Sequence, residues 1–378
     1  MKLLRGLGVL CGVLTAMEGR AQPAAAKAED VSAQLAPVIQ RHNLPGMVAA
    51  VVEGDRVVAT GAAGVRVQGG RDAVTLADRF HLGSCTKTMT ATLCAMLVEE
   101  GKLRWDSTVG DVFPNVKAVH PGFRKVTLEQ LLNQRSGAPG EVDAELWASL
   151  WAPKGVAARR KVLETVFARP PQSEPGTQYV YSNFNYALAG HMAETVARKP
   201  WEDLMREKLF VPLGMTSAGF GAPRDAGKVR QPHGHTSDGK PVEPTAQGAD
   251  NPPAIGPAGT VHCSVGDWAK FVMLHLQGER GKAKLLKAET FKKLHTPPEG
   301  SPYAMGWLVG PSPLGKGVAL NHAGSNRMWY AVTWVLPESD LAVLVMCNQG
   351  EPGAAAEKAC DEAVALLIRR QVGRKGAK

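Results

Sequence analysis

The 378-residue chain lacks several features that would mark other protein classes. No run approaches the roughly 18 consecutive apolar residues of a membrane-spanning helix, which excludes a polytopic membrane protein. Six cysteines without CxxC spacing signal neither a disulfide framework nor a zinc site. Charged residues make up 21% and hydrophobic residues 44%, and glycine and proline show no period, which excludes disordered, collagenous and coiled-coil proteins. The length predicts one large or two interleaved domains.

Familiar enzyme motifs are also missing. The chain has no GxSxG, GxxxxGK[ST], GxGxxG or HExxH sequence, so α/β-hydrolase, P-loop, dinucleotide-binding and zincin folds have no support. His233-Gly234-His235 lacks a third ligand of suitable spacing, and we expect a surface turn there. No motif in the sequence therefore indicates a bound metal or nucleotide.

The two ends of the chain are unlike the rest. Residues 1–21 are typical of a signal peptide, with Lys2 and Arg5 before an apolar stretch and a small-x-small site at Gly19-Arg20-Ala21. We therefore expect a periplasmic or secreted protein. Five of the basic residues behind the net charge of +9 lie in the last ten positions. They predict a basic, disordered tail at 371–378 rather than nucleic-acid binding.

Hydrophobic periodicity predicts strand-rich ends around a helical middle. A helix at 31–42 precedes strands at 47–52, 56–60 and 64–68, with a hairpin turn at 53–55. A helix starting at Ser84 stops at Gly101. The later elements are strands at 304–309, 328–336 and 341–347 and a helix at 354–370. We expect an α/β domain from residues 30–102 and 250–370, with an antiparallel sheet, and an all-α insertion at 103–249.

Ser84 and Lys87 form a Ser-x-x-Lys sequence at the predicted helix start. Residues three apart on a helix lie on one face, so the amine comes within hydrogen-bond reach of the hydroxyl. Serine needs an adjacent base to become a nucleophile, and lysine serves only when its pKa is depressed. A helix N-terminus also favours an oxyanion there. An N-cap serine followed by a solvent-facing lysine is the structural alternative.

Two later segments favour catalysis. Tyr181-x-Asn183 combines a phenol able to shuttle a proton with an amide able to hold a lysine and a substrate carbonyl. His322-x-Gly324 stands where a strand begins, and its glycine permits a ligand to lie close to the strand edge.

The three motifs in this order resemble the serine β-lactamase and penicillin-binding superfamily, in its class C β-lactamase and D-Ala-D-Ala carboxypeptidase branch. The resemblance covers about residues 32–370 and includes Pro212-Leu213-Gly214-Met215 and Tyr303-Ala304-Met305-Gly306-Trp307. It implies an antiparallel sheet flanked by helices with a helical insertion. It also implies that no cofactor is needed, because a covalent acyl-serine splits hydrolysis into two steps.

The resemblance further implies a role for each matching residue. Ser84 would be the acylated nucleophile and Lys87 its proton acceptor. Tyr181 would pass a proton to the leaving group or activate water. The remaining roles are substrate and lysine orientation by Asn183, a pocket-facing position for His322, and an oxyanion hole from the N–H groups of Ser84 and Ser325.

Several positions depart from the family pattern. His322 stands where class C β-lactamases usually carry lysine, and Ala323 stands where a hydroxyl would hold a substrate carboxylate. Gln134 stands where many relatives have histidine. We expect Gln134, Ala323, Gly324 and Arg327 to contact the substrate, with Arg327 as a substitute cation.

The leading hypothesis is a serine acyl hydrolase that acts on an ester, an amide or a D-amino-acid peptide through an acyl-Ser84 intermediate. Its substrate would be a small molecule or peptide, with peptidoglycan fragments among the candidates. The alternatives are a β-lactamase or D-Ala-D-Ala carboxypeptidase proper, a non-catalytic protein that binds peptidoglycan or β-lactams, and a cytoplasmic esterase.

Overall fold

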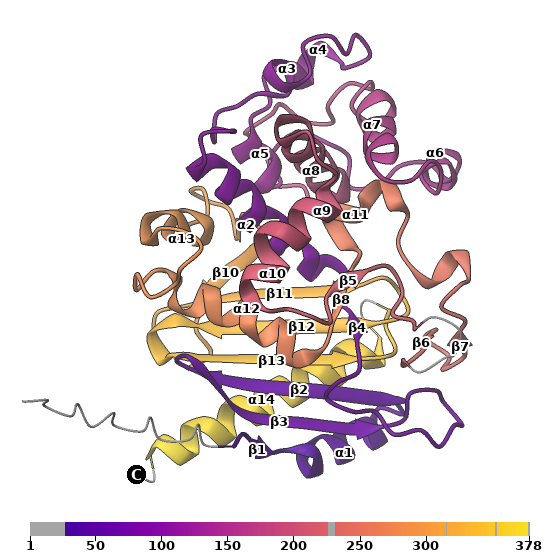
Figure 1. Cartoon of the computed structure of the whole chain (residues 1–378), viewed down its shortest axis with the longest axis vertical. Helices are drawn as coiled ribbons and strands as arrows, with labels where there is room; N and C mark the ends of the chain where they lie inside the picture. Colours follow the sequence, from indigo (N-terminus) through magenta and orange to yellow (C-terminus); the bar gives the residue numbers. More distant parts are fainter. Residues whose placement is uncertain (1–26, 226–230, 315, 352–353, 377–378) are drawn as a thin grey trace, which may run out of the picture.

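An eight-stranded sheet forms the base of the protein (Figure 1). The computed structural model describes residues 27–225, 231–314, 316–351 and 354–376. The strand order is β1-β3-β2-β13-β12-β11-β10-β9, and every pair is antiparallel except β1 with β3. The strands are β1 (Glu29–Asp30), β2 (Gly46–Glu53), β3 (Arg56–Gly64), β9 (Tyr303–Ala304), β10 (Trp307–Pro311), β11 (Val318–Ser325), β12 (Tyr330–Leu336) and β13 (Leu341–Cys347). The predicted sheet of antiparallel strands from both parts of the chain is confirmed.

Alternating apolar side chains give the sheet two buried faces. In β2, Val48, Ala50 and Val52 join one core, whereas Met47 and its alternate neighbours join the other. The first core lies between one face of the sheet and the helices α2 (Thr86–Glu99) and α12 (Val265–Gly278). The second core lies between the other face and the helices α1 (Ser32–Arg41) and α14 (Ala355–Gly376). In Figure 1, α12 and α14 lie on opposite faces of the sheet, and α1 lies beside β3.

Helices between the two halves of the sheet form the opposite end of the molecule (Figure 1). They are α3 (Val109–Val112), α4 (Pro121–Arg124), α5 (Leu128–Leu132), α6 (Ala144–Ser149), α7 (Val156–Thr165) and α8 (Asn183–Ala197). Nearer the sheet lie α9 (Trp201–Met205), α10 (Val211–Leu213), α11 (Gly256–Gly259) and α13 (Ala288–His295). Small sheets join β4 (Phe80–His81) with β8 (Val261–Cys263) and β5 (Gly219–Phe220), and β6 (Gly234–His235) with β7 (Pro241–Val242).

The structure corrects several local expectations. The predicted strand at 64–68 does not form, because Gly64 ends β3 in a left-handed conformation with φ 88°. The predicted strand at 304–309 is two strands, because Met305 and Gly306 turn the chain with φ values of 37° and 102°. His233 and His235 are buried rather than in a surface turn, and His235 Nδ1 donates to the carbonyl of Asn348.

The C-terminal tail is helical rather than disordered as far as the structure describes it. Helix α14 continues to Gly376, and Arg370 and Arg374 pair with Glu29 of the edge strand β1. These ion pairs give the basic residues a folded partner. The predicted signal peptide at 1–21 and the last two residues lie outside the described residues.

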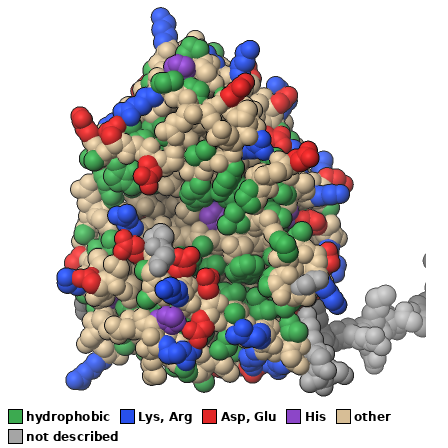
Figure 2. All heavy atoms as spheres, turned by 180° about the vertical axis from the view of Figure 1, so that it is seen from behind, with side chains coloured by type: hydrophobic (Ala, Val, Ile, Leu, Met, Phe, Trp, Pro, Cys, Tyr) green, Lys and Arg blue, Asp and Glu red, His purple; other side chains and the backbone are tan. Residues whose placement is uncertain are grey.

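Three further features concern the described residues alone. Their five cysteines are buried and unbridged. Their helices include none long and apolar enough to cross a membrane, and their side chains form no cluster of three or more metal-ligating groups. On the face shown in Figure 2, hydrophobic side chains gather toward the middle, and charged side chains of both signs lie mostly toward the edges.

Candidate active site

Ser84 is the one partly exposed residue in a buried stretch. All the other residues from His81 to Leu97 are buried. Ser84 lies in the 3-10 turn η1 (Gly83–Cys85) directly before α2, so the predicted helix start is confirmed to within two residues. Cys85 points into packing, with no exposed surface, and burial raises the pKa of its thiol. Among these side chains, the Ser84 hydroxyl is therefore the one open to a substrate.

Lys87 is completely buried beside that hydroxyl. Its Nζ lies 3.0 Å from Ser84 Oγ and donates to Asn183 Oδ1 at 2.7 Å and to the Ala258 carbonyl at 2.9 Å. Burial lowers the pKa of Lys87 well below its usual value. A neutral amine has two hydrogens and one lone pair. When the two carbonyl oxygens take both hydrogens, the lone pair is directed at Ser84, which is the arrangement a general base requires.

Tyr181 closes the site over the amine. Its ring centroid lies 4.7 Å from Lys87 Nζ, and the residue is 37% exposed. Burial of its hydroxyl raises the pKa of the phenol, and a hydrogen bond with Ser84 opposes that rise. The phenol therefore keeps its proton at neutral pH. It can donate to a developing anion or relay a proton from Ser84 and Lys87.

His322 of β11 is neutral and has a defined tautomer. Nδ1 lies 2.6 Å from the Ala323 carbonyl, which can only accept, so Nδ1 carries the proton. Nε2 then accepts from the Tyr303 hydroxyl at 3.3 Å. Burial, with a smaller effect of the Lys87 charge, lowers the pKa of His322 to about 3. His322 therefore contributes no positive charge at neutral pH.

Two glycines bring the turn with Ser84 against β11. A Cβ on Gly324 would lie 2.1 Å from the Leu82 carbonyl and 2.5 Å from Ser84 N. A Cβ on Gly83 would lie 2.4 Å from Ser325 N. The backbone amides of Ser84 and Ser325, which we expect to form the oxyanion hole, therefore lie where this turn contacts β11. Gly324 is needed for packing against this turn, which differs from the expectation that it makes room for a ligand.

Gln134 holds the Tyr181 loop instead of facing a substrate. Its side chain is fully buried, and Oε1 accepts from Ser182 N–H at 3.0 Å and Asn185 Nδ2 at 2.7 Å. Its backbone carbonyl accepts from Val180 N–H at 2.9 Å. This geometry contradicts the expected substrate contact, because an amide engaged on both sides of Tyr181 fixes that loop from behind.

Comparisons with known proteins agree with this geometry. The family model described as Beta-lactamase matches residues 27–367. The chain belongs to the beta-lactamase family. Penicillin-binding protein 4 of Amycolatopsis lactamdurans is 29% identical over 82% of each chain. Unguisins hydrolase of Aspergillus campestris is 26% identical over 74% of this chain and 54% of its own length. The class C beta lactamase of Rhodobacter sphaeroides superposes with a TM-score of 0.68 at 25% identity, over 88% of this chain and 97% of that one.

Family membership makes the chain a beta-lactamase-like serine hydrolase. Within that family fold, Ser84, Lys87, Tyr181, Asn183 and His322 lie in one cluster, although they come from three distant segments.

Ala323 and Arg327 lie apart from that cluster. Ala323 occupies the opposite face of β11 from His322 and packs against the second core. Arg327 is exposed in a left-handed turn with φ 73°, and its backbone N–H donates to Ser325 Oγ at 2.9 Å. The Ala323 side chain therefore points away from the cluster, which contradicts its expected contact with substrate, and a contact of Arg327 remains a prediction.

Sequence reasoning missed two partners of the site. The Ala258 carbonyl, one of the two acceptors for Lys87, lies in the short helix α11. A backbone carbonyl carries no side-chain signal. The hydroxyl of Tyr303, in the segment shared with the family, donates to Nε2 of His322 once the Ala323 carbonyl has fixed the proton on Nδ1. Its sequence context indicates a strand and not a partner.

Proposed function

We propose that this hydrolase forms an acyl-Ser84 intermediate and that its preferred substrates are short neutral esters or amides. The buried Lys87, with two carbonyl acceptors and its third direction toward Ser84 Oγ, carries the proposal. A non-catalytic binding protein would have no need to keep an amine neutral at the cost of burying it. This observation favours catalysis over simple binding.

In the acylation step, Lys87 takes the hydroxyl proton while Ser84 Oγ bonds to the substrate carbonyl carbon. The N–H groups of Ser84 and Ser325 receive the oxyanion. Tyr181 donates a proton to the leaving alcohol or amine and regains one from Lys87. In the second step, a water gives a proton to the Tyr181 and Lys87 pair and attacks the ester carbon. The pair returns that proton to Ser84 Oγ as its bond to the carbonyl carbon breaks, which releases the acid and free Ser84.

The preference for neutral substrates rests on charge. A neutral His322 cannot pair with a carboxylate. A lost hydrogen bond to a charged group costs roughly 1.5–3 kcal/mol, or about 10- to 150-fold in binding. Relatives named for penicillin binding and for hydrolysis both match, so membership of the family does not select a substrate. The absence of a positive charge on His322 therefore disfavours substrates that carry a carboxylate.

We further propose export, because residues 1–21 are typical of a signal peptide. N-terminal sequencing of the mature protein from the native host should begin near Gln22. A protein that retains Met1 would instead favour the cytoplasmic esterase.

The first experiment is intact-mass analysis with a fluorophosphonate, a short ester and a penicillin. Wild-type protein should gain one adduct that maps to Ser84, and Ser84→Ala should gain none while it melts at the same temperature. An adduct that persists in Ser84→Ala, or that maps to Cys85, contradicts the assignment. Absence of any adduct with all three probes would favour the binding protein.

The second experiment compares kcat/KM for a neutral ester, a neutral amide, benzylpenicillin and a D-Ala-D-Ala peptide. The neutral substrates should be turned over faster, and His322→Lys, which adds a positive charge facing the pocket, should gain selectively on the two carboxylates. A wide wild-type preference for the carboxylates would contradict the charge argument. It would assign their recognition to Arg327, with Arg327→Gln as the variant to measure.

A further inference from the structure

A histidine and a carboxylate lie directly behind the turn that carries Ser84. His81 in β4 is completely buried, and its Nδ1 accepts from Gly83 N–H at 3.0 Å. Its Nε2 lies 2.8 Å from Asp250 Oδ1. A carboxylate has no hydrogen to give, so Nε2 carries the proton and Nδ1 is left as the acceptor. Asp250 thereby selects the tautomer that holds Gly83.

The same loop reaches the lysine side of the site. Asp250 Oδ1 also accepts from Asn251 N–H at 2.7 Å, and Asn251 Nδ2 donates to the Gly259 carbonyl at 2.7 Å. Gly259 follows Ala258, whose carbonyl accepts from Lys87 Nζ. Two consecutive residues of one loop are therefore connected to the nucleophile turn and to the acceptor that orients the base.

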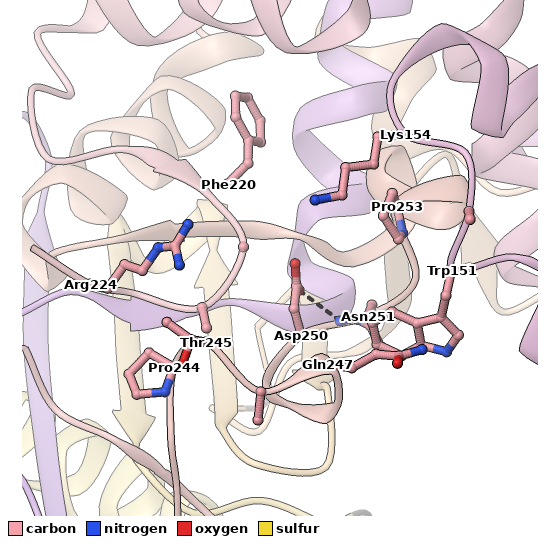
Figure 3. A pocket seen from close by; sticks show the side chains of 14 residues that line it. Trp151, Lys154, Phe220, Arg224, Pro244, Thr245, Gln247, Asp250, Asn251 and Pro253 are labelled. Carbon is pink, nitrogen blue, oxygen red and sulfur yellow. Dashed lines mark hydrogen bonds between the residues drawn. The ribbon is translucent and has the colours of Figure 1, made fainter. Parts of the chain in front are cut away.

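Asp250 also lines a cavity of about 500 Å³ (Figure 3). Figure 3 shows its carboxylate near the middle, between the side chains of Lys154 and Arg224. The Asp250 side chain is 25% exposed, whereas that of His81 is fully enclosed. The pair therefore joins a solvent-accessible carboxylate to a backbone amide one residue before the nucleophile.

The N–H of Gly83, which donates to His81, needs an acceptor from outside its own turn. Gly83 N–H is the first donor of a helical turn, where no acceptor exists within the turn itself. Gly83 has φ 50° and packs against the backbone of Ser325, so rotation of its peptide would move Ser84 N away from Ser325 N. A bond to a buried imidazole holds that peptide in one orientation.

We propose that His81 and Asp250 are positioning residues that hold the Gly83–Cys85 turn in the orientation required for acylation. His81 acts through its Nδ1 acceptor, and Asp250 acts by fixing the tautomer of His81. Neither touches the substrate. The proposal rests on the acyl-Ser84 mechanism and adds to it a device for aligning the oxyanion-binding amides.

Two substitutions at His81 separate this role from simple filling of space. In His81→Asn the side-chain oxygen takes the place of Nδ1 and still accepts from Gly83, so kcat should stay within about threefold of wild type. In His81→Phe the ring is retained but the acceptor is lost, so kcat should fall about 100-fold with KM little changed. The opposite ranking, with Phe active and Asn inactive, would overturn the proposal.

His120 provides a matched control. Its Nδ1 accepts from Gly122 N–H at 3.1 Å with the same spacing of two residues, but it caps α4 in the helical end of the molecule. His120→Phe should leave kcat unchanged. An equal loss of kcat in His120→Phe would show that the losses come from general destabilisation, and would contradict a specific role of His81.

Asp250→Asn tests the tautomer. An amide can either accept from or donate to Nε2, so the wrong tautomer becomes available and kcat should fall about tenfold at unchanged KM. In the His81→Asn background, which has no tautomer to fix, the same change should have less than a twofold effect. Full additivity of the two substitutions would overturn the role of Asp250.

A readout that needs no catalysis separates this proposal from the function itself. In Ser84→Ala protein labelled with ¹⁵N-glycine, the Gly83 amide resonance should keep its position in His81→Asn and move in His81→Phe. A Gly83 signal unaffected by His81→Phe overturns the hydrogen bond. Failure of wild-type protein to acylate at Ser84 would refute the proposed function, while this spectrum would still decide the Gly83 contact.

Discussion

Asn183→Asp should shift the pH dependence of acylation to higher pH. Asn183 Oδ1 lies 2.7 Å from Lys87 Nζ and accepts one of its hydrogens. A carboxylate at that place would stabilise the ammonium form of Lys87 and thus raise its pKa. The active form is the neutral amine, so the acylation rate rises with pH up to this pKa and levels off above it.

The size of the shift follows from the separation. Two unit charges 2.7 Å apart attract by about 6 kcal/mol at an effective dielectric constant of 20 and by about 1.5 kcal/mol at 80. One pKa unit corresponds to about 1.4 kcal/mol, so the pKa of Lys87 should rise by about 1 to 4 units. Well below its pKa, each unit removes about a factor of ten from the neutral fraction. The pH at which the acylation rate reaches half of its maximum should therefore rise by about 1 to 4 units.

The assay is the rate of fluorophosphonate labelling between pH 5 and pH 11, since a neutral probe does not itself respond to the added charge. Asn183→Leu is the matched control. It removes the same acceptor without adding charge, so its profile should move to lower pH or stay in place. Superimposable profiles for Asn183→Asp and wild type would refute Lys87 as the titrating base.

Three further predictions concern individual side chains. Lys87→Arg should be inactive at every pH up to 11, because guanidinium does not deprotonate in proteins; wild-type-like labelling would move the base role to Tyr181. Arg159 is buried between two carboxylates, so Arg159→Ala should lower the free energy of unfolding by about 3–5 kcal/mol. A loss below about 1 kcal/mol, measured by urea unfolding, would contradict this. Gly324→Ala should abolish labelling, because its Cβ would lie 2.1 Å from the Leu82 carbonyl, whereas Gly310→Ala on β10 meets no atom within 4 Å and should label normally.

Much of the fold follows from local patterns in the sequence. Continuous runs of apolar residues at 47–52 and 341–347 reflect a sheet buried on both faces, and the structure pairs these strands directly. Boundaries set by a single backbone angle were harder to predict. Met305 shows why: nothing in its side chain indicates φ 37°, yet that angle divides a predicted strand into β9 and β10.

The prediction of a disordered C-terminal tail was wrong for a different reason. Its basic composition is typical of a solvated end, but the ion pairs of Arg370 and Arg374 with Glu29 depend on β1, more than 300 residues away in the sequence. Composition describes a segment by itself. It carries no information on a partner that only the folded chain brings close.

The sequence by itself determined the chemistry at Ser84 and Lys87, because a spacing of three residues at a helix start suffices to place an amine beside a hydroxyl. Only the tertiary structure decided the protonation of that amine. The Ala258 carbonyl and Asn183 reach Lys87 from distant segments, and burial among them lowers its pKa well below the usual value. The position of Gln134 in the sequence, where many relatives have histidine, likewise predicts a substrate contact. Its burial depends on the packed loop around Tyr181, which the sequence does not show. Spacing is a local property, and proton affinity depends on every group that surrounds the atom.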